Sequence, residues 1–212
     1  MSDVKNDVLV FDTDAWKKDL PAISKQIEIF PLVPEIHPAL KFKLPEFDFA
    51  NPPVNPPEFA SSLVETCKKY NGIGLSANQC GYNYRVFVMG SGDEYVAFFN
   101  PKIISVSEEK TRMEEGCLSY MDLFLNIERP SIIEVEYQDF RGDTKTTKFT
   151  GITARCFQHE LDHMNGIVYT MHVKPLAMQL AMKRRSKLAD QRRKIQKKMI
   201  NKVKEKFNVK RF

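Results

Sequence analysis

Apolar residues recur at helical spacing in three parts of the chain. A first amphipathic helix, ending near Gly72, is predicted by four such positions: Phe59, Leu63, Cys67 and Tyr70. A second helix is predicted over residues 153–165, where Gly166 supplies a suitable C-cap. Pro175 opens a third, much longer helical stretch that runs to about Phe207.

Between the first two helices the pattern becomes strand-like. Short runs rich in β-branched and aromatic residues predict five strands, over residues 85–89, 95–99, 102–106, 132–137 and 144–149. The tripeptide Arg141-Gly142-Asp143 is a hairpin signal between the last two. This order predicts an α+β fold, with mainly antiparallel sheets packed around the central helix and a long C-terminal helix.

Proline divides the chain into segments. Eight of the twelve prolines lie between residues 31 and 57, which predicts an extended, wrapping loop. We expect an N-terminal extension over residues 1–30, a main domain over 31–174 and a basic C-terminal helix or tail over 175–212.

The net charge of +5 is unevenly distributed. Residues 183–211 contain 14 Lys and Arg against Asp190 and Glu205, a local charge of +12, whereas residues 1–182 carry −7. The basic helix has two interpretations that the sequence leaves open. It could dock on nucleic acid phosphates, or it could be a solvated basic helix that serves solubility.

Composition excludes several classes of protein. A chain of 212 residues can bury a real core, and no run of 18 apolar residues suggests a membrane span. We expect no signal peptide, because no basic segment followed by an apolar one opens the sequence. Four cysteines do not make a disulfide scaffold, so we expect a reducing cytoplasm. An organellar compartment or a viral origin stays open.

The clearest chemical signal is the run His159-Glu160-Leu161-Asp162-His163. Histidines four residues apart on a helix face the same way, so His159 and His163 can bind one metal ion. Glu160 lies beside them as a carboxylate that can handle the protons of a water molecule. The motif alone indicates a metal-dependent hydrolase.

A thiol is the best candidate for a third ligand. Cys117 lies in a loop-like segment next to Gly116, whereas the rival Cys156 lies on the motif helix itself. Three ligands from one helix would strain the geometry, so Cys117 is favoured. Two imidazoles and a thiolate suit Zn, Fe(II), Co or Ni. Cys67 is interpreted as a core residue and Cys80 as a small residue after a turn.

The glycine-rich segment of residues 71–81 could be mistaken for a dinucleotide-binding motif. That motif follows a strand and opens a helix, whereas this segment follows a helix and precedes a strand. Its glycines instead allow close approach of a ligand to the backbone. Gln79 could direct an amide N–H at a developing oxyanion, although a glycine-rich turn with a surface glutamine is the simpler alternative.

Three segments taken together resemble the three signature motifs of peptide deformylases. In chain order they are Gly72-Ile73-Gly74-Leu75-Ser76-Ala77-Asn78-Gln79, Glu115-Gly116-Cys117-Leu118-Ser119 and Gln158-His159-Glu160-Leu161-Asp162-His163-Met164-Asn165-Gly166. The resemblance covers about residues 31–172. It departs from the family pattern at Ser76, where the family usually has alanine, and at Tyr120-Met121-Asp122, where many relatives have Pro-Gly close by.

The resemblance implies a role for each matching residue. Cys117, His159 and His163 would bind one divalent ion, with Fe(II) expected natively and Zn, Ni or Co as substitutes. Glu160 would be the general base and acid. Gln79 and the backbone N–H of Leu118 would stabilise the oxyanion, and substrate would bind along Ile73, Gly74 and Gly116. The reaction would remove the formyl group from N-formylmethionine at the start of nascent polypeptides.

The resemblance also bears on partners. It implies an N-formylmethionyl peptide substrate, and it makes ribosomal RNA the partner in the first of the two interpretations of the basic tail. We expect a monomer. Two rival hypotheses remain. A generic zinc peptidase would need a histidine or glutamate downstream as its third ligand, and the only downstream histidine is His172. A ribosome- or RNA-binding protein with a vestigial metal site is disfavoured by the intact Gln79, Cys117 and Glu160.

Overall fold

The computed structural model describes residues 27–208, so most of the predicted N-terminal extension and residues 209–212 of the tail lie outside the described residues. The helices are α2 (Pro56–Lys69), α3 (Gly151–Met164) and α4 (Pro175–Asn208), with short 3-10 helices η1 (Pro38–Lys41), η2 (Ala77–Cys80) and η3 (Tyr169–His172). The strands are β1 (Gly74–Ser76), β2 (Val86–Ser91), β3 (Glu94–Val106), β4 (Lys110–Cys117), β5 (Tyr120–Pro130), β6 (Ile132–Gln138) and β7 (Thr144–Thr150). The predicted α+β class is confirmed.

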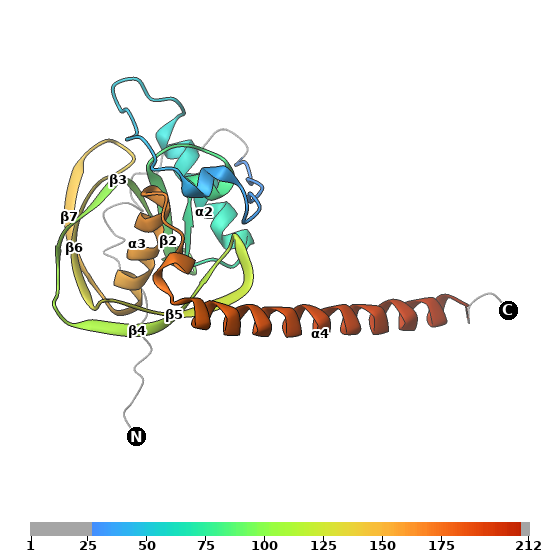
Figure 1. Cartoon of the computed structure of the whole chain (residues 1–212). Coiled ribbons are helices and arrows are strands. Elements are labelled where there is room, and N and C mark those ends of the chain that lie inside the picture. Colours follow the sequence, from blue (N-terminus) through green and yellow to red (C-terminus); the bar gives the residue numbers. More distant parts are fainter. Residues whose placement is uncertain (1–26, 209–212) are drawn as a thin grey trace.

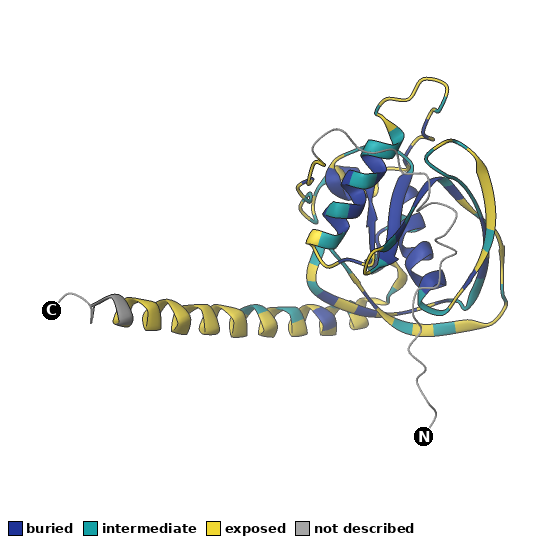
Figure 2. Cartoon of the chain, turned by 180° about the vertical axis from the view of Figure 1, so that it is seen from behind, coloured by how far each residue is buried: buried dark blue, intermediate teal, exposed yellow. Residues whose placement is uncertain are grey.

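A five-stranded antiparallel sheet separates two helices. Its strand order is β1-β2-β3-β6-β7, which leaves β1 at an edge. Val86 and Val88 of β2 pack with the buried face of α2, whereas Phe87 and Met89 pack with α3 on the opposite face. Successive side chains of β2 therefore point to opposite faces of the sheet, and both faces are buried. The helix α3 is buried along most of its length, as Figure 2 shows.

A second sheet of two strands, β4 and β5, runs past the other side of α3 (Figure 1). The pairing of β4 with β5 has an irregularity between Glu115 and Cys117, immediately before the turn. Outside this hairpin, Leu123, Leu125 and Ile127 form a small core with residues after α3 and with α4. The hairpin is therefore clamped between α3 and the start of α4.

Helix α4 packs on β5 near its start and then extends away from the body (Figures 1 and 2). Ala181 is buried under the hairpin, whereas almost every later side chain described is exposed. Two arginines still reach back to the body, since Arg185 pairs with Glu35 and Arg192 with Asp122. No helix within residues 27–208 is both long and apolar enough to span a membrane.

Several predicted boundaries need adjustment. The strands expected over 95–99 and 102–106 are one strand, β3, with irregular pairing to β6 at two places. Strands β1, β4 and β5 were not predicted. The helix expected over 153–165 begins at Gly151 and ends at Met164, and Gly166 follows it with a left-handed φ of 72°. The proline-rich segment contains only η1 as regular structure among residues 31–55.

Candidate metal centre

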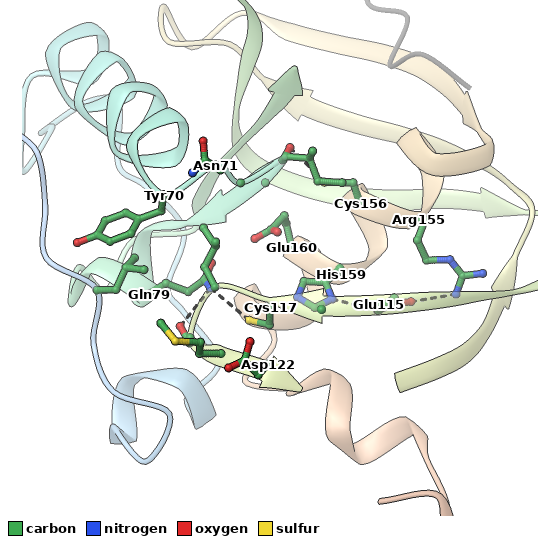
Figure 3. A pocket seen from close by; sticks show the side chains of 18 of the residues that line it. Tyr70, Asn71, Gln79, Glu115, Cys117, Asp122, Arg155, Cys156, His159 and Glu160 are labelled. Atoms are coloured by element: carbon green, nitrogen blue, oxygen red, sulfur yellow. Dashed lines mark hydrogen bonds and ion pairs between the residues drawn. The ribbon is translucent and has the colours of Figure 1, made fainter. Parts of the chain in front are cut away.

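A cavity of about 780 Å³ lies where three elements meet (Figure 3). The edge strand β1 with η2 forms one side, the turn between β4 and β5 the other, and α3 the floor. Its walls include eight of the nine residues to which the sequence analysis assigned a role: Ile73, Gly74, Gln79, Gly116, Cys117, Leu118, His159 and Glu160. The ninth, His163, is buried one helical turn beyond His159.

The three expected ligands converge on one point. One donor atom each from Cys117, His159 and His163 lies within 4.8 Å of the other two. The Sγ atom of Cys117 is 3.4 Å from Nε2 of His163. Helix α3 supplies both imidazoles from one face, and the end of β4 supplies the thiol from another direction. One transition-metal ion can bridge donors at this spacing.

The two other candidate ligands are engaged elsewhere. Cys156 is directed at the carbonyl oxygen of Ile73, 3.5 Å away, and burial raises the pKa of its thiol well above the usual range. His172 lies 2.7 Å from a carboxylate oxygen of Asp162 and does not join the ligand cluster. The generic peptidase hypothesis needs a downstream histidine or glutamate as third ligand, and none joins the cluster found among the described residues.

A buried ionic network orients His159. Nδ1 of its ring lies 3.0 Å from Oε2 of Glu115, which leaves Nε2 free to face the cavity. Two arginines, Arg129 and Arg155, donate to the same carboxylate at 2.7 to 2.9 Å. Burial acts to raise the pKa of Glu115, but the hydrogen bonds from His159 and Arg129 outweigh it and hold that pKa well below its usual range.

Glu160 is buried at the cavity floor, next to strand β1. A Cβ atom at Gly74 would come within 2.5 Å of Oε1 of Glu160, so this position of β1 has no room for a side chain. On the other carboxylate oxygen, the hydroxyl of Ser76 donates a hydrogen bond of 2.6 Å to Oε2. Burial raises the pKa of the Glu160 carboxyl from its usual value.

The side chain of Gln79 points from η2 toward the thiol (Figure 3). Its amide Nε2 donates to Sγ of Cys117 at 3.4 Å and to Oγ of Ser119 at 3.1 Å. Its Oε1 accepts a hydrogen bond of 2.9 Å from the backbone N–H of Ser76. The amide orientation is fixed by these contacts, and it directs N–H donors into the site. The alternative of a surface glutamine is wrong, because Gln79 is 2% exposed.

Sequence reasoning assigned no function to three residues that support the site. Glu115 belongs to the second quoted motif, and its carboxylate beside a candidate thiolate ligand was a signal that could have been used. No local sequence pattern identifies Arg129 as part of the site, because it lies beside Glu115 only once β5 has paired with β4. Ser76 was interpreted as a small residue in place of alanine, yet its hydroxyl contacts Glu160.

A thiol and two imidazoles beside a buried carboxylate, at the floor of an open cavity, are typical of a metal-dependent hydrolase. The sequence model of the polypeptide deformylase family matches residues 32–179. The chain belongs to this family of enzymes, whose activity is the deformylation of nascent peptides.

Known relatives are similar over most of the same region. A peptide deformylase from Thermotoga neapolitana is 43% identical over 122 residues, which are 58% of this chain and 74% of that protein. One from Rhizobium meliloti is 37% identical over 138 residues, covering 63% of this chain and 79% of that protein.

Solved structures support the same fold. The crystal structure of the Thermotoga maritima peptide deformylase has a TM-score of 0.64 and 35% identity, covering 70% of this chain and 99% of that one. A Met-Ala-Ser-bound class I type b peptide deformylase from Acinetobacter baumannii has a TM-score of 0.66 and 28% identity. It covers 70% of this chain and 100% of its own.

Proposed function

We propose that the chain removes the formyl group from N-formylmethionine at the N-terminus of nascent polypeptides by metal-assisted hydrolysis. One observation carries this function: three metal-ligating side chains converge at the cavity that also exposes Glu160 and Gln79. The reacting amide, the base and the oxyanion donor can therefore meet in one place.

Cys117, His159 and His163 would hold one divalent ion. When bound, such an ion lowers the pKa of a water molecule toward ~7 and polarises a carbonyl oxygen. The mixed sulfur and nitrogen donors suit Fe(II), Zn, Ni and Co alike, and we propose Fe(II) as the native ion. Metal analysis of protein purified without oxygen tests this choice, since iron should predominate there and activity should decay in air.

Glu160 is proposed to act as the general base and acid. It accepts a proton from the attacking water and returns it to the amine nitrogen as the C–N bond breaks. Burial raises the pKa of its carboxyl from the usual value. A carboxylate with a raised pKa is a stronger base toward the attacking water. The amide of Gln79 and the backbone N–H of Leu118 would donate to the oxygen on which negative charge develops.

The substrate peptide would bind between the two sheets. Strand β1 lies at the edge of its sheet, so its free side can pair with an extended peptide through Ile73 and Gly74. Gly116, on β4 across the cavity, would bind the other side of that peptide. The Met-Ala-Ser-bound relative from Acinetobacter baumannii supports peptide binding by this fold.

The basic helix α4 is proposed to contact ribosomal RNA, with the enzyme acting as a monomer in the cytoplasm. Its exposed Lys and Arg side chains project beyond the body, where phosphates can reach them. Because the catalytic cavity lies on the body, docking through the far half of α4 would leave the cavity open to an emerging peptide.

A single assay tests the proposed activity. Purified protein is incubated with a formyl-Met peptide and with the same peptide lacking the formyl group, and released formate and free amine are measured. We expect stoichiometric formate and amine from the first peptide and no cleavage of the second. Cleavage of an internal peptide bond would favour a general peptidase, and binding without turnover would favour a vestigial site.

A further inference from the structure

The hydroxyl of Ser76 makes the one side-chain hydrogen bond recorded for the carboxylate of Glu160 within the described residues. Oγ of Ser76 donates to Oε2 of Glu160 at 2.6 Å, a short distance typical of a hydrogen bond to a charged oxygen. Both side chains are almost completely buried, at 0% and 4% exposure. No basic side chain forms an ion pair with this carboxylate among the salt bridges of residues 27–208.

The serine hydroxyl is held in place before any substrate binds. The backbone of Ser76 belongs to β1 and pairs with Phe87 of β2. Its N–H donates to Oε1 of Gln79, so the same residue is fixed by the proposed oxyanion donor. A donor fixed on two sides loses little conformational entropy when it orients a partner. An alanine at this position would keep a small side chain but offer no donor to Glu160.

We propose that Ser76 is a positioning residue for the reaction, acting through Glu160. Its hydroxyl donates to Oε2, and we assign proton exchange to Oε1, which accepts no side-chain hydrogen bond among the described residues. This inference rests on the proposed role of Glu160 as general base.

In the hydrolysis, the water oxygen bonds to the formyl carbon and one water proton moves to Oε1. The C–N bond then breaks, its electron pair stays on nitrogen, and the proton passes from Oε1 to that nitrogen. Formate and the free amine are the products, and Ser76 keeps its own proton throughout. The carboxylate must hold one orientation for both transfers, and the hydroxyl supplies that restraint.

The test is the substitution Ser76→Ala in the full chain, assayed on a formyl-Met peptide. We expect kcat to fall roughly threefold to tenfold, as for the loss of one ordinary hydrogen bond, with KM within about twofold. Metal content and thermal midpoint should match the unchanged protein. Ser62→Ala is the matched control, because it removes another buried hydroxyl, on α2 and away from the cavity. It should leave kcat unchanged.

A double substitution separates positioning from simple packing. In a Glu160→Gln background the general base is gone, so adding Ser76→Ala should lower the residual rate no further. An equal loss in both backgrounds would overturn the inference, as would loss of metal or an unchanged kcat in the single variant. If the unchanged protein releases no formate, the proposed function itself fails, which is a different result.

Discussion

At the residue scale, one short turn contacts three different parts of the site. The hydroxyl of Ser76 donates a hydrogen bond to Glu160, and the amide of Gln79 donates one to the thiol of Cys117. The amide of Asn78 donates to the backbone carbonyl of His163 at 3.1 Å. The contacts of Ser76 and Asn78 are buried and that of Gln79 is partly buried, so a displaced turn cannot be repaired by water at low cost. Residues 76–79 therefore fix the position of the proposed oxyanion donor relative to the metal ligands.

The assignment of the third ligand can be tested by comparing two cysteines. Cys117→Ala removes the one thiol in the ligand cluster, so metal binding should weaken strongly and activity should be abolished. Cys156→Ala removes a buried thiol that faces Ile73, so metal content and most activity should survive. Metal stoichiometry and formate release check both variants. Equal losses would mean that Cys156 is a ligand or is required to support one.

The role of Glu160 is tested by an isosteric change. Glu160→Gln keeps the volume of the side chain and can still accept from Ser76, but it cannot take a proton from water. We expect metal to be retained and kcat to fall by roughly 10²-fold or more, which is typical of a lost general base. Metal analysis run beside the kinetics distinguishes the alternative. If metal and activity decline in parallel, Glu160 is structural.

At the element scale, the sequence predicted the helices more accurately than the strands. Helical spacing is carried by many residues, and α2, α3 and α4 were all expected near their observed bounds. Strand β4 is polar along most of its length and alternates exposed with half-buried residues, so no local pattern identifies it. The ligands were predictable because two lie on one helix and the third in a recognised motif.

The ionic network around Glu115 could not be predicted in the same way. Its members come from β4, β5 and α3, and they meet only once the two-stranded sheet packs beside the helix. Arg129 is the register partner of Thr111, and its guanidinium reaches Glu115 from the neighbouring strand. Contacts between residues distant in sequence depend on packing that local propensity does not encode.

Helix α4 touches the rim of the cavity through one ion pair. Arg192 lies 2.7 Å from Asp122, which lines the cavity and has an unusual left-handed φ of 61°. Arg192→Glu would set two carboxylates against each other and displace this rim. We expect KM for a formyl-peptide to rise roughly twofold to fivefold at low salt, with kcat little changed, since exposed pairs contribute modestly.

The neighbouring arginine offers a matched control for that experiment. Among the described residues, Arg193 forms an ion pair with Asp190 of its own helix, at 3.9 Å, so Arg193→Glu changes the net charge equally without touching the rim. Michaelis profiles of both variants at low and high salt provide the measurement. A rise in KM of equal size in the two variants would mean that long-range charge, not the contact with Asp122, determines the effect.

At the scale of the whole molecule, the charges are separated between the body and the helix. The first 182 residues carry a net charge of −7 and residues 183–211 a net charge of +12. A polyanion such as RNA would therefore repel the body and attract the helix. If α4 docks on RNA as proposed, this separation favours contact through the helix rather than through the body.

Shortening α4 tests contact through the helix without disturbing the cavity. Truncation after Lys194 keeps the pairs of Arg185 with Glu35 and Arg192 with Asp122, and it removes seven Lys and Arg together with Glu205. We expect kcat/KM on a short formyl-peptide to stay within a few-fold of the full chain. Binding to ribosomes should weaken and depend less steeply on salt, because fewer counterions are released.

Truncation after Met182 serves as the comparison, because it also removes both ion pairs with the body. It should weaken ribosome binding further and, unlike the longer form, raise KM for the short peptide. Sedimentation with ribosomes across a salt series, run beside the peptide assay, measures both properties. If the chain ending at Lys194 binds ribosomes as tightly as the full chain, the far half of α4 is a solvated helix, and any docking must use another surface.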